Sequence, residues 1–202
     1  SISELEEIYP KASARSKEDE AFHLKAMEFT KRLQTGDKGI RALWRHIMNV
    51  SGADLKKNYG RLGASFDLWR GESDADPAIK TLVDELKRKG IAHESGGALI
   101  VDVEEENDTR TIPPCIILKS DGASLYSTSD LATIEQRMSE FEPEEMVYVV
   151  DKRQDMHFIQ VFRAARKARL VMPETKLSFV GFGTMNGNDG KPFKTRDGGV
   201  PR

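Results

Sequence analysis

The chain has 202 residues, of which 38% are hydrophobic and 32% charged, with a single cysteine and a formal net charge of −2. This length can bury a substantial core, and the lone Cys115 excludes an internal disulfide framework and is expected to be a small buried hydrophobe. No apolar run approaches the roughly 18 residues that span a bilayer, and the acidic N-terminus lacks the apolar core of a signal peptide. We therefore expect a soluble cytoplasmic protein that has no membrane partner.

Charge is unevenly distributed along the chain. Residues 152–202 carry 11 Lys and Arg against 4 Asp and Glu, which leaves 20 basic and 29 acidic residues in the rest. A basic C-terminal quarter on an acidic body favours a phosphate-bearing ligand near the end of the chain. Chance clustering on a charged surface is the alternative.

The first third of the chain has helical periodicity. Phe22, Ala26 and Phe29 predict a helix over residues 17–33, and a second apolar face follows over residues 40–62. The simplest arrangement is two antiparallel helices. We expect their aromatic side chains to form core rather than a ligand site.

The middle of the chain predicts a short helix and two hairpin turns. The helix covers residues 78–89, and the turn signals are Ser95-Gly96-Gly97 and Asp121-Gly122. Strand-like runs flank these turns at residues 91–94, 98–103 and 115–119. The acidic residues 104–108 are interpreted as a solvated turn rather than a metal site.

The next segment predicts an α/β arrangement. The expected elements are a helix at 129–141, a strand at 146–150, a helix at 155–168 and a short strand at 177–180. The strand at 146–150 shows no polar alternation, which suits the middle of a parallel sheet covered on both faces. Ligands of such sheets bind beyond the carboxyl ends of the strands, where residues 126–130 and 151–157 would lie.

Tyr126 and Asp130 are the first candidates for a binding site. If both face this edge of the sheet, they offer one hydroxyl and one carboxylate, and a carboxylate suits a cationic group such as a guanidinium. Ser127-x-x-Asp130 fits the capping box at a helix N-terminus equally well. The pattern alone leaves both interpretations open.

Gln154 and His157 are the second candidates, at the junction of the strand and the following helix. A helix N-terminus presents free N–H groups to anions or polar ligands. Asp155 could be the N-cap of this helix, and a single histidine in such a place is more often structural.

The glycine-rich segment 181–199 is the third candidate. Repeated glycine lets backbone N–H groups approach phosphates, and Lys191, Lys194 and Arg196 add positive charge. The segment matches neither G-x-x-x-x-G-K-[ST] nor G-x-G-x-x-G, and a disordered tail fits equally. No nucleophile triad or zinc motif stands out.

Three blocks of sequence stand out, and they read SDGASLYSTSDLATI from Ser120, VVDKRQDMHFIQVF from Val149 and GFGTMNGNDGKPFKTRDGG from Gly181. These blocks resemble the catalytic domain of arginyl-tRNA synthetases. Shorter blocks, among them LQTGD, YGRLGASFD and GES, agree in order, and the resemblance covers essentially the whole chain.

The resemblance implies an α/β fold, the second half of a class I Rossmann-type nucleotide-binding domain with an inserted helical and β-hairpin region. Residues 1–110 would be the insertion. Residues 111–202 would be the second half, ending in the loop equivalent to the family's K-M-S-K-S signature. The chain contains no H-x-G-H, so it resembles an internal fragment that is expected to be inactive alone.

The resemblance also implies residue roles. Tyr126 and Asp130 match positions that bind the arginine guanidinium, and Gln154 matches a contact to the amino-acid head group. The implied ATP-binding residues are His157, Gly181, Phe182, Gly183 and Thr195. The implied catalytic cations of the signature loop are Lys191, Lys194 and Arg196.

The implied reaction is ATP-dependent activation of L-arginine and its transfer to tRNA(Arg). Mg²⁺ would arrive with ATP rather than at a metal motif of the protein, and the parent enzyme would be a monomer. A non-catalytic arginine- or nucleotide-binding module derived from the synthetase is the alternative.

Overall fold

The computed structural model describes residues 2–187, 190 and 192. The chain forms two compact units, Trp69–Thr184 on the one hand and Ser1–Leu68 with the segment from Met185 on the other. Across the described residues, no helix is long and apolar enough to cross a membrane.

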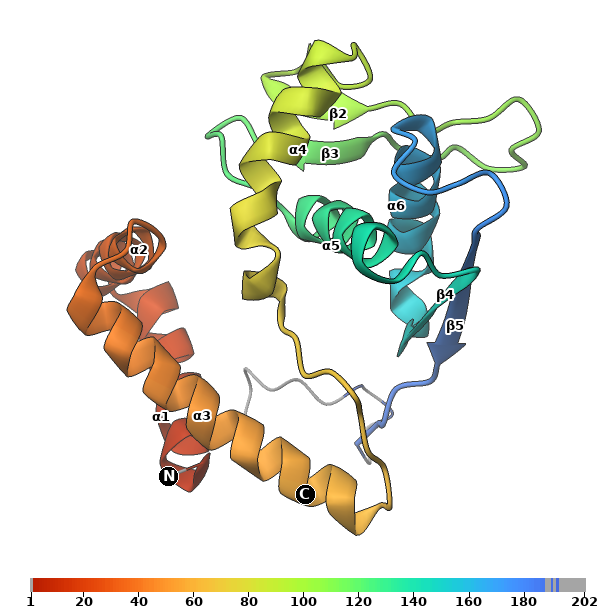
Figure 1. Ribbon diagram of the computed structural model, residues 1–202. Coiled ribbons are helices and arrows are strands. Elements are labelled where there is room, and N and C mark those ends of the chain that lie inside the picture. The colour runs from red at the N-terminus through yellow and green to blue at the C-terminus, as the bar shows by residue number, and fades with distance from the viewer. Residues whose placement is uncertain (1, 188–189, 191, 193–202) are drawn as a thin grey trace. The chain divides into compact units, whose positions relative to one another are not determined.

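The first unit is built from helices α1 (Ile2–Glu18), α2 (Glu20–Gln34) and α3 (Lys38–Arg61) (Figure 1). Aspartates start two of them. Asp19 caps α2 by accepting a hydrogen bond from the Phe22 N–H at 3.0 Å, and Asp37 caps α3 through the N–H groups of Gly39 and Ile40. The two predicted helices are confirmed as α2 and α3, whereas α1, which contains Pro10, is a further helix that the sequence analysis did not predict.

The apolar stripe of the first unit is not the core that the periodicity predicts. No residue of α1 or α3 is buried, and Leu43 and Leu62 have exposed fractions of 60% and 81%. Among the described residues, the apolar side chains of α1 and α3 are therefore only partly covered by the neighbouring helices.

The second unit begins with helix α4 (Asp76–Arg88) and a three-stranded antiparallel sheet. The strands are β1 (His93–Ser95), β2 (Ala98–Val101) and β3 (Cys115–Leu118), in the order β1-β2-β3. Gly96 and Gly97 both have positive φ, as a two-residue hairpin turn requires. The predicted hairpin is therefore confirmed.

The chain continues through a parallel pair of strands joined by a helix. The elements are α5 (Tyr126–Phe141), β4 (Glu145–Asp151), a 3₁₀ turn η2 (Lys152–Gln154), α6 (Asp155–Lys167) and β5 (Lys176–Phe182). β4 and β5 pair in parallel, with Val150 opposite Gly181. The carboxyl ends of both strands therefore lie at the same edge.

Strand β4 is covered on one face, and not on both as the sequence predicts. Met146 and Tyr148 are buried in the core, whereas Val147 and Val149 have exposed fractions of 53% and 63%. In the described part of the chain, the core to which α5 and α6 contribute covers only the face of β4 that carries Met146 and Tyr148. The uniform apolarity of the strand thus does not report its burial here.

The boundary between the compact units lies at residue 68, whereas the sequence analysis divides the chain at residue 110. Leu82 and Leu86 of α4 and Val101 of β2 belong to one core with Ile117 and Leu131. Residues 69–110 therefore pack as part of the second unit, because their apolar faces are buried against β3 and α5.

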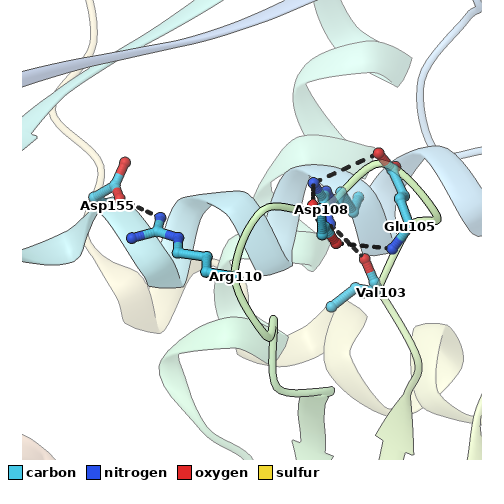
Figure 2. Close-up of polar contacts among 6 residues, drawn as sticks. Val103, Glu105, Asp108, Arg110 and Asp155 are labelled. Carbon is cyan, nitrogen blue, oxygen red and sulfur yellow. Dashed lines mark hydrogen bonds and ion pairs between the residues drawn. The ribbon is translucent and has the colours of Figure 1, made fainter.

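The acidic loop after β2 is fixed to α6 (Figure 2). The Arg163 guanidinium donates to both carboxylate oxygens of Asp108 at 2.6 Å and to the Val103 carbonyl at 2.9 Å. The Glu105 N–H donates to Asp108 at 2.8 Å, and Arg110 donates to Asp155 at 2.8 Å. Residues 104–107 are exposed and form a turn at 106–107, so the predicted solvated turn is confirmed, and Asp108 in addition holds it to α6.

Asp108 should stabilise the fold in a pH-dependent way. Hydrogen bonds from Arg163 and the Glu105 N–H lower the pKa of its carboxyl from 3.8 to about 2. A depressed pKa gives stability that is present above the unfolded value and is lost as pH falls through the folded one. We expect Asp108→Asn to lower the thermal midpoint at pH 7. The difference from wild type should shrink below about pH 4, and a difference that stays constant down to about pH 3 would contradict this.

Candidate functional site

The start of α5 is fixed to β3 by two hydroxyl groups. Ser127 Oγ donates to the Ile116 carbonyl and Thr128 Oγ1 to the Ile117 carbonyl, and both side chains are buried. The Leu125 N–H in turn donates to Thr128 Oγ1 at 3.3 Å. Because both hydroxyls are buried and hydrogen-bonded, these two bonds fix the start of α5 against β3.

Asp130 is not a helix cap. Helix α5 begins at Tyr126 with Leu125 as its N-cap, which places Asp130 inside the helix. The capping-box interpretation of Ser127-x-x-Asp130 was therefore wrong, since Ser127 and Thr128 bond the carbonyls of β3. The Asp130 carboxylate is left for partners outside its own helix.

That partner is His157. His157 Nε2 and Asp130 Oδ2 are 2.6 Å apart, with side-chain exposed fractions of 26% and 29%. His157 lies in the first turn of α6, and its ring also meets Phe158 edge-on at 5.0 Å. The structure thus joins the first and second candidate groups of the sequence, across 27 residues of chain.

Tyr126 lies one helical turn before Asp130 in α5, and its side chain is exposed. Residues four apart occupy the same helix face. Gln154 ends η2 and is exposed at the start of α6. The interpretation of Asp155 as the N-cap of α6 was wrong, because Gln154 is the N-cap and Asp155 pairs with Arg110.

A hollow of about 320 Å³ lies beside Tyr126. Its lining residues are Glu72, Asp76, Ile79, Lys119, Ser124, Leu125, Tyr126 and Ser129. It brings the 3₁₀ turn η1 (Glu72–Asp74) and α4 next to the start of α5. The hollow is acidic on one side, and its cation Lys119 is paired with Asp121 at 3.3 Å.

Glu72 is a site residue that the sequence analysis did not select. Partial loss of water, followed by the negative charges of Asp130 and Asp76, raises the pKa of its carboxyl. Carboxylates that raise one another's pKa are kept ionised by a cation placed between them. The signal in the sequence was the short block GES, which agreed with the resemblance but suggested no role.

The carboxyl edge of β4 and β5 holds three of the residues predicted to bind ATP, which are Gly181, Phe182 and Gly183. Phe182 lies opposite Asp151 in the strand register, and Phe182 and Gly183 are exposed. A Cβ at Gly181 would lie 2.9 Å from the Phe179 ring and 3.0 Å from the Lys152 Cα. Gly181 is therefore needed for the close approach of η2 to β5, whereas a Cβ at Gly183 would meet nothing within 4 Å.

The remaining predicted residues cannot be placed. Lys191, Lys194, Thr195 and Arg196 lie outside the described residues. Among the residues that are described, no group of three or more His, Cys, Asp or Glu side chains could hold a metal ion. Cys115 is buried, and burial raises the pKa of its thiol to about 12, so it stays protonated.

The fold agrees with the similarity of the chain to known proteins. The family model of the class I tRNA synthetases (R), catalytic domain, matches residues 1–202. The chain belongs to this arginyl-tRNA synthetase family. Relatives called arginine–tRNA ligase from Agathobacter rectalis and Alkaliphilus oremlandii are 62% and 56% identical over the whole chain.

The chain spans about a third of these synthetases, because each alignment covers 34% of the relative. A solved structure supports the same fold. Arginyl-tRNA synthetase from Plasmodium falciparum superposes with a TM-score of 0.70 and 26% sequence identity, over 82% of this chain and 28% of that one. The α/β fold of a class I synthetase catalytic domain is thus established for the chain.

Proposed function

We propose that the chain forms the arginine-binding part of an arginine–tRNA ligase, within the second half of its Rossmann-type domain. The observation that carries the proposal is the acidic hollow, where Glu72 and Tyr126 line the wall and the Asp130 charge acts on Glu72. The substrates would be L-arginine, ATP and tRNA(Arg). The proposal includes a cytoplasmic, monomeric parent enzyme.

The chemistry of the hollow suits a guanidinium. This group is planar, always charged, and presents a fork of donors that carboxylates accept pairwise. Two carboxylates and a tyrosine hydroxyl would leave lysine, a point charge, and citrulline, an uncharged isostere, poorly matched. Because α5 is bonded to β3 through Ser127 and Thr128, the Asp130 carboxylate is pre-organised for this contact.

His157 supports this pocket through Asp130. Their contact of 2.6 Å fixes the orientation of the carboxylate from the neighbouring helix. Gln154 lies one turn earlier at the exposed N-terminus of α6, where it could bond the amino-acid head group. A direct contact of His157 with ATP stays a prediction.

ATP would bind along the carboxyl edge of β4 and β5. The open space beside Gly183 and the exposed Phe182 ring fit a planar base lying against backbone. Phosphate contacts by Lys191, Lys194, Thr195 and Arg196, with Mg²⁺ carried by the nucleotide, belong to the same proposal. The arginine carboxylate would attack the α-phosphorus of bound ATP and displace pyrophosphate, and the protein would contribute mainly position and charge.

The test uses the full-length product of the gene that encodes this chain. ATP–pyrophosphate exchange is measured with each amino acid, with and without tRNA. We expect exchange with arginine only, and not with lysine or citrulline. Absence of exchange with every amino acid, together with retained arginine binding, would overturn the proposal in favour of the non-catalytic binding module.

A further inference from the structure

The segment that carries Glu72 is attached to helix α5 on its N-terminal side. Arg70 forms a two-pronged ion pair with Glu140, with Nη1–Oε2 and Nη2–Oε1 distances of 2.6 and 2.7 Å. The Arg70 guanidinium also lies 5.8 Å from the centre of the Phe141 ring. Two parallel hydrogen bonds fix both position and angle, unlike an ordinary surface ion pair.

The same segment is attached on its C-terminal side. Gln136 Nε2 donates to the Asp74 carbonyl at 3.3 Å, and the Asp74 carboxylate accepts from the Gly71 N–H at 2.7 Å. Glu72 therefore lies between two residues that bond to α5, Arg70 and Asp74. The bond from the Gly71 N–H to the Asp74 carboxylate closes the turn that contains Glu72. The three residues Arg70, Gln136 and Glu140 line a hollow of about 470 Å³, separate from the one that Glu72 lines.

Helix α5 therefore connects the acidic hollow with the two contacts that hold the Glu72 segment. Its N-terminal part carries Tyr126 and Asp130, and its C-terminal part carries Gln136 and Glu140. Partial burial and, after it, the Asp130 and Asp76 charges raise the pKa of Glu72. The Arg70–Glu140 pair and the Gln136–Asp74 bond hold the backbone on both sides of Glu72 against α5.

We propose that Arg70, through its ion pair with Glu140, is a positioning residue that holds Glu72 in the arginine pocket. This ion pair, the tether, should affect the affinity for arginine and not the affinity for ATP, because the proposed ATP site lies at the carboxyl edge of β4 and β5. This inference rests on the proposed function, because its readout is the binding of arginine.

The test compares Arg70→Gln, Glu140→Gln and the charge exchange Arg70→Glu with Glu140→Arg in the full-length gene product. We expect each single change to raise the KM for arginine about tenfold, with kcat and the KM for ATP nearly unchanged. The double exchange should restore most of the affinity, because it re-forms the pair with reversed charges. Arg70→Lys, the mildest change, should raise the KM about threefold because it loses the second prong.

The matched control is Arg32→Gln, which breaks an ion pair with Asp37 at 2.8 Å in the helical unit. Its KM for arginine should equal that of wild type. An unchanged KM in both single variants, a parallel rise in the KM for ATP, or no recovery in the double exchange would overturn the tether. In those cases wild type still exchanges with arginine, whereas failure of the proposed function would remove that exchange altogether.

Discussion

Replacing Asp130 with asparagine is expected to lower kcat/KM for arginine about a thousandfold, because one of the two carboxylates proposed to bind the charged fork of donors becomes a neutral acceptor. The substituted side chain would still offer a carbonyl oxygen to His157, whose Nε2 lies 2.6 Å from the present carboxylate. The geometry of the pocket should therefore survive while its charge is lost. Pyrophosphate exchange at saturating ATP, with tRNA present, measures the effect.

The control for this variant is Asp155→Asn on the neighbouring helix. Asp155 is also a carboxylate near the start of α6, but it pairs with Arg110 outside the hollow. We expect its kcat/KM to stay within about threefold of wild type, as for other exposed ion pairs. Equal losses in the two variants would show that the Asp130 effect is a general disturbance of α6, and would remove Asp130 from the pocket.

Local signals predicted much of the second unit. The helix expected at residues 155–168 is α6 at Asp155–Lys167, and the turn at Gly96-Gly97 has the backbone that glycine permits. The strand expected at 146–150 is β4 at Glu145–Asp151. These elements have strong periodicity or a turn that few other residues can form, so local sequence is sufficient to identify them.

Several errors share one physical cause, which is that the deciding contact lies far away in sequence. Ser127 fits a capping box, but its hydroxyl bonds the Ile116 carbonyl of β3, which lies 11 residues earlier. The coverage of β4 depends on which helices pack on each face and not on its own composition. The role of Asp130 was left open by its pattern because its partner, His157, comes from another helix.

Glu72 shows the same limit at the site itself. It precedes Asp130 by 58 residues in the sequence, and the two act on each other only because α4 packs on α5. No spacing rule connects an acidic residue in a short 3₁₀ turn with one inside a later helix. The family resemblance supplied the roles of Tyr126, Asp130 and Gln154, but the second carboxylate was found through the hollow that it lines.

Replacing Glu72 with glutamine should raise the KM for arginine about thirtyfold near neutral pH, with a smaller change in kcat, since it removes one of the two charges that we propose bind the guanidinium. The effect should depend on pH. Loss of water and the Asp130 charge raise the pKa of Glu72 above 4.5, so it takes up a proton at a higher pH than an ordinary glutamate. Protonated Glu72 and glutamine are equally uncharged.

The KM values of wild type and Glu72→Gln should therefore converge as pH falls from neutral into the range where Glu72 takes up its proton, which lies at a higher pH than for an ordinary glutamate. Bound arginine stabilises the ionised carboxylate, so wild type should also release protons on binding arginine at the acidic end of this range, and the variant should release fewer. Glu135→Gln is the control, because burial and Glu85, rather than Asp130, raise the pKa of Glu135. If the ratio of the two KM values were the same at every pH, the Glu72 charge would not be what binds arginine.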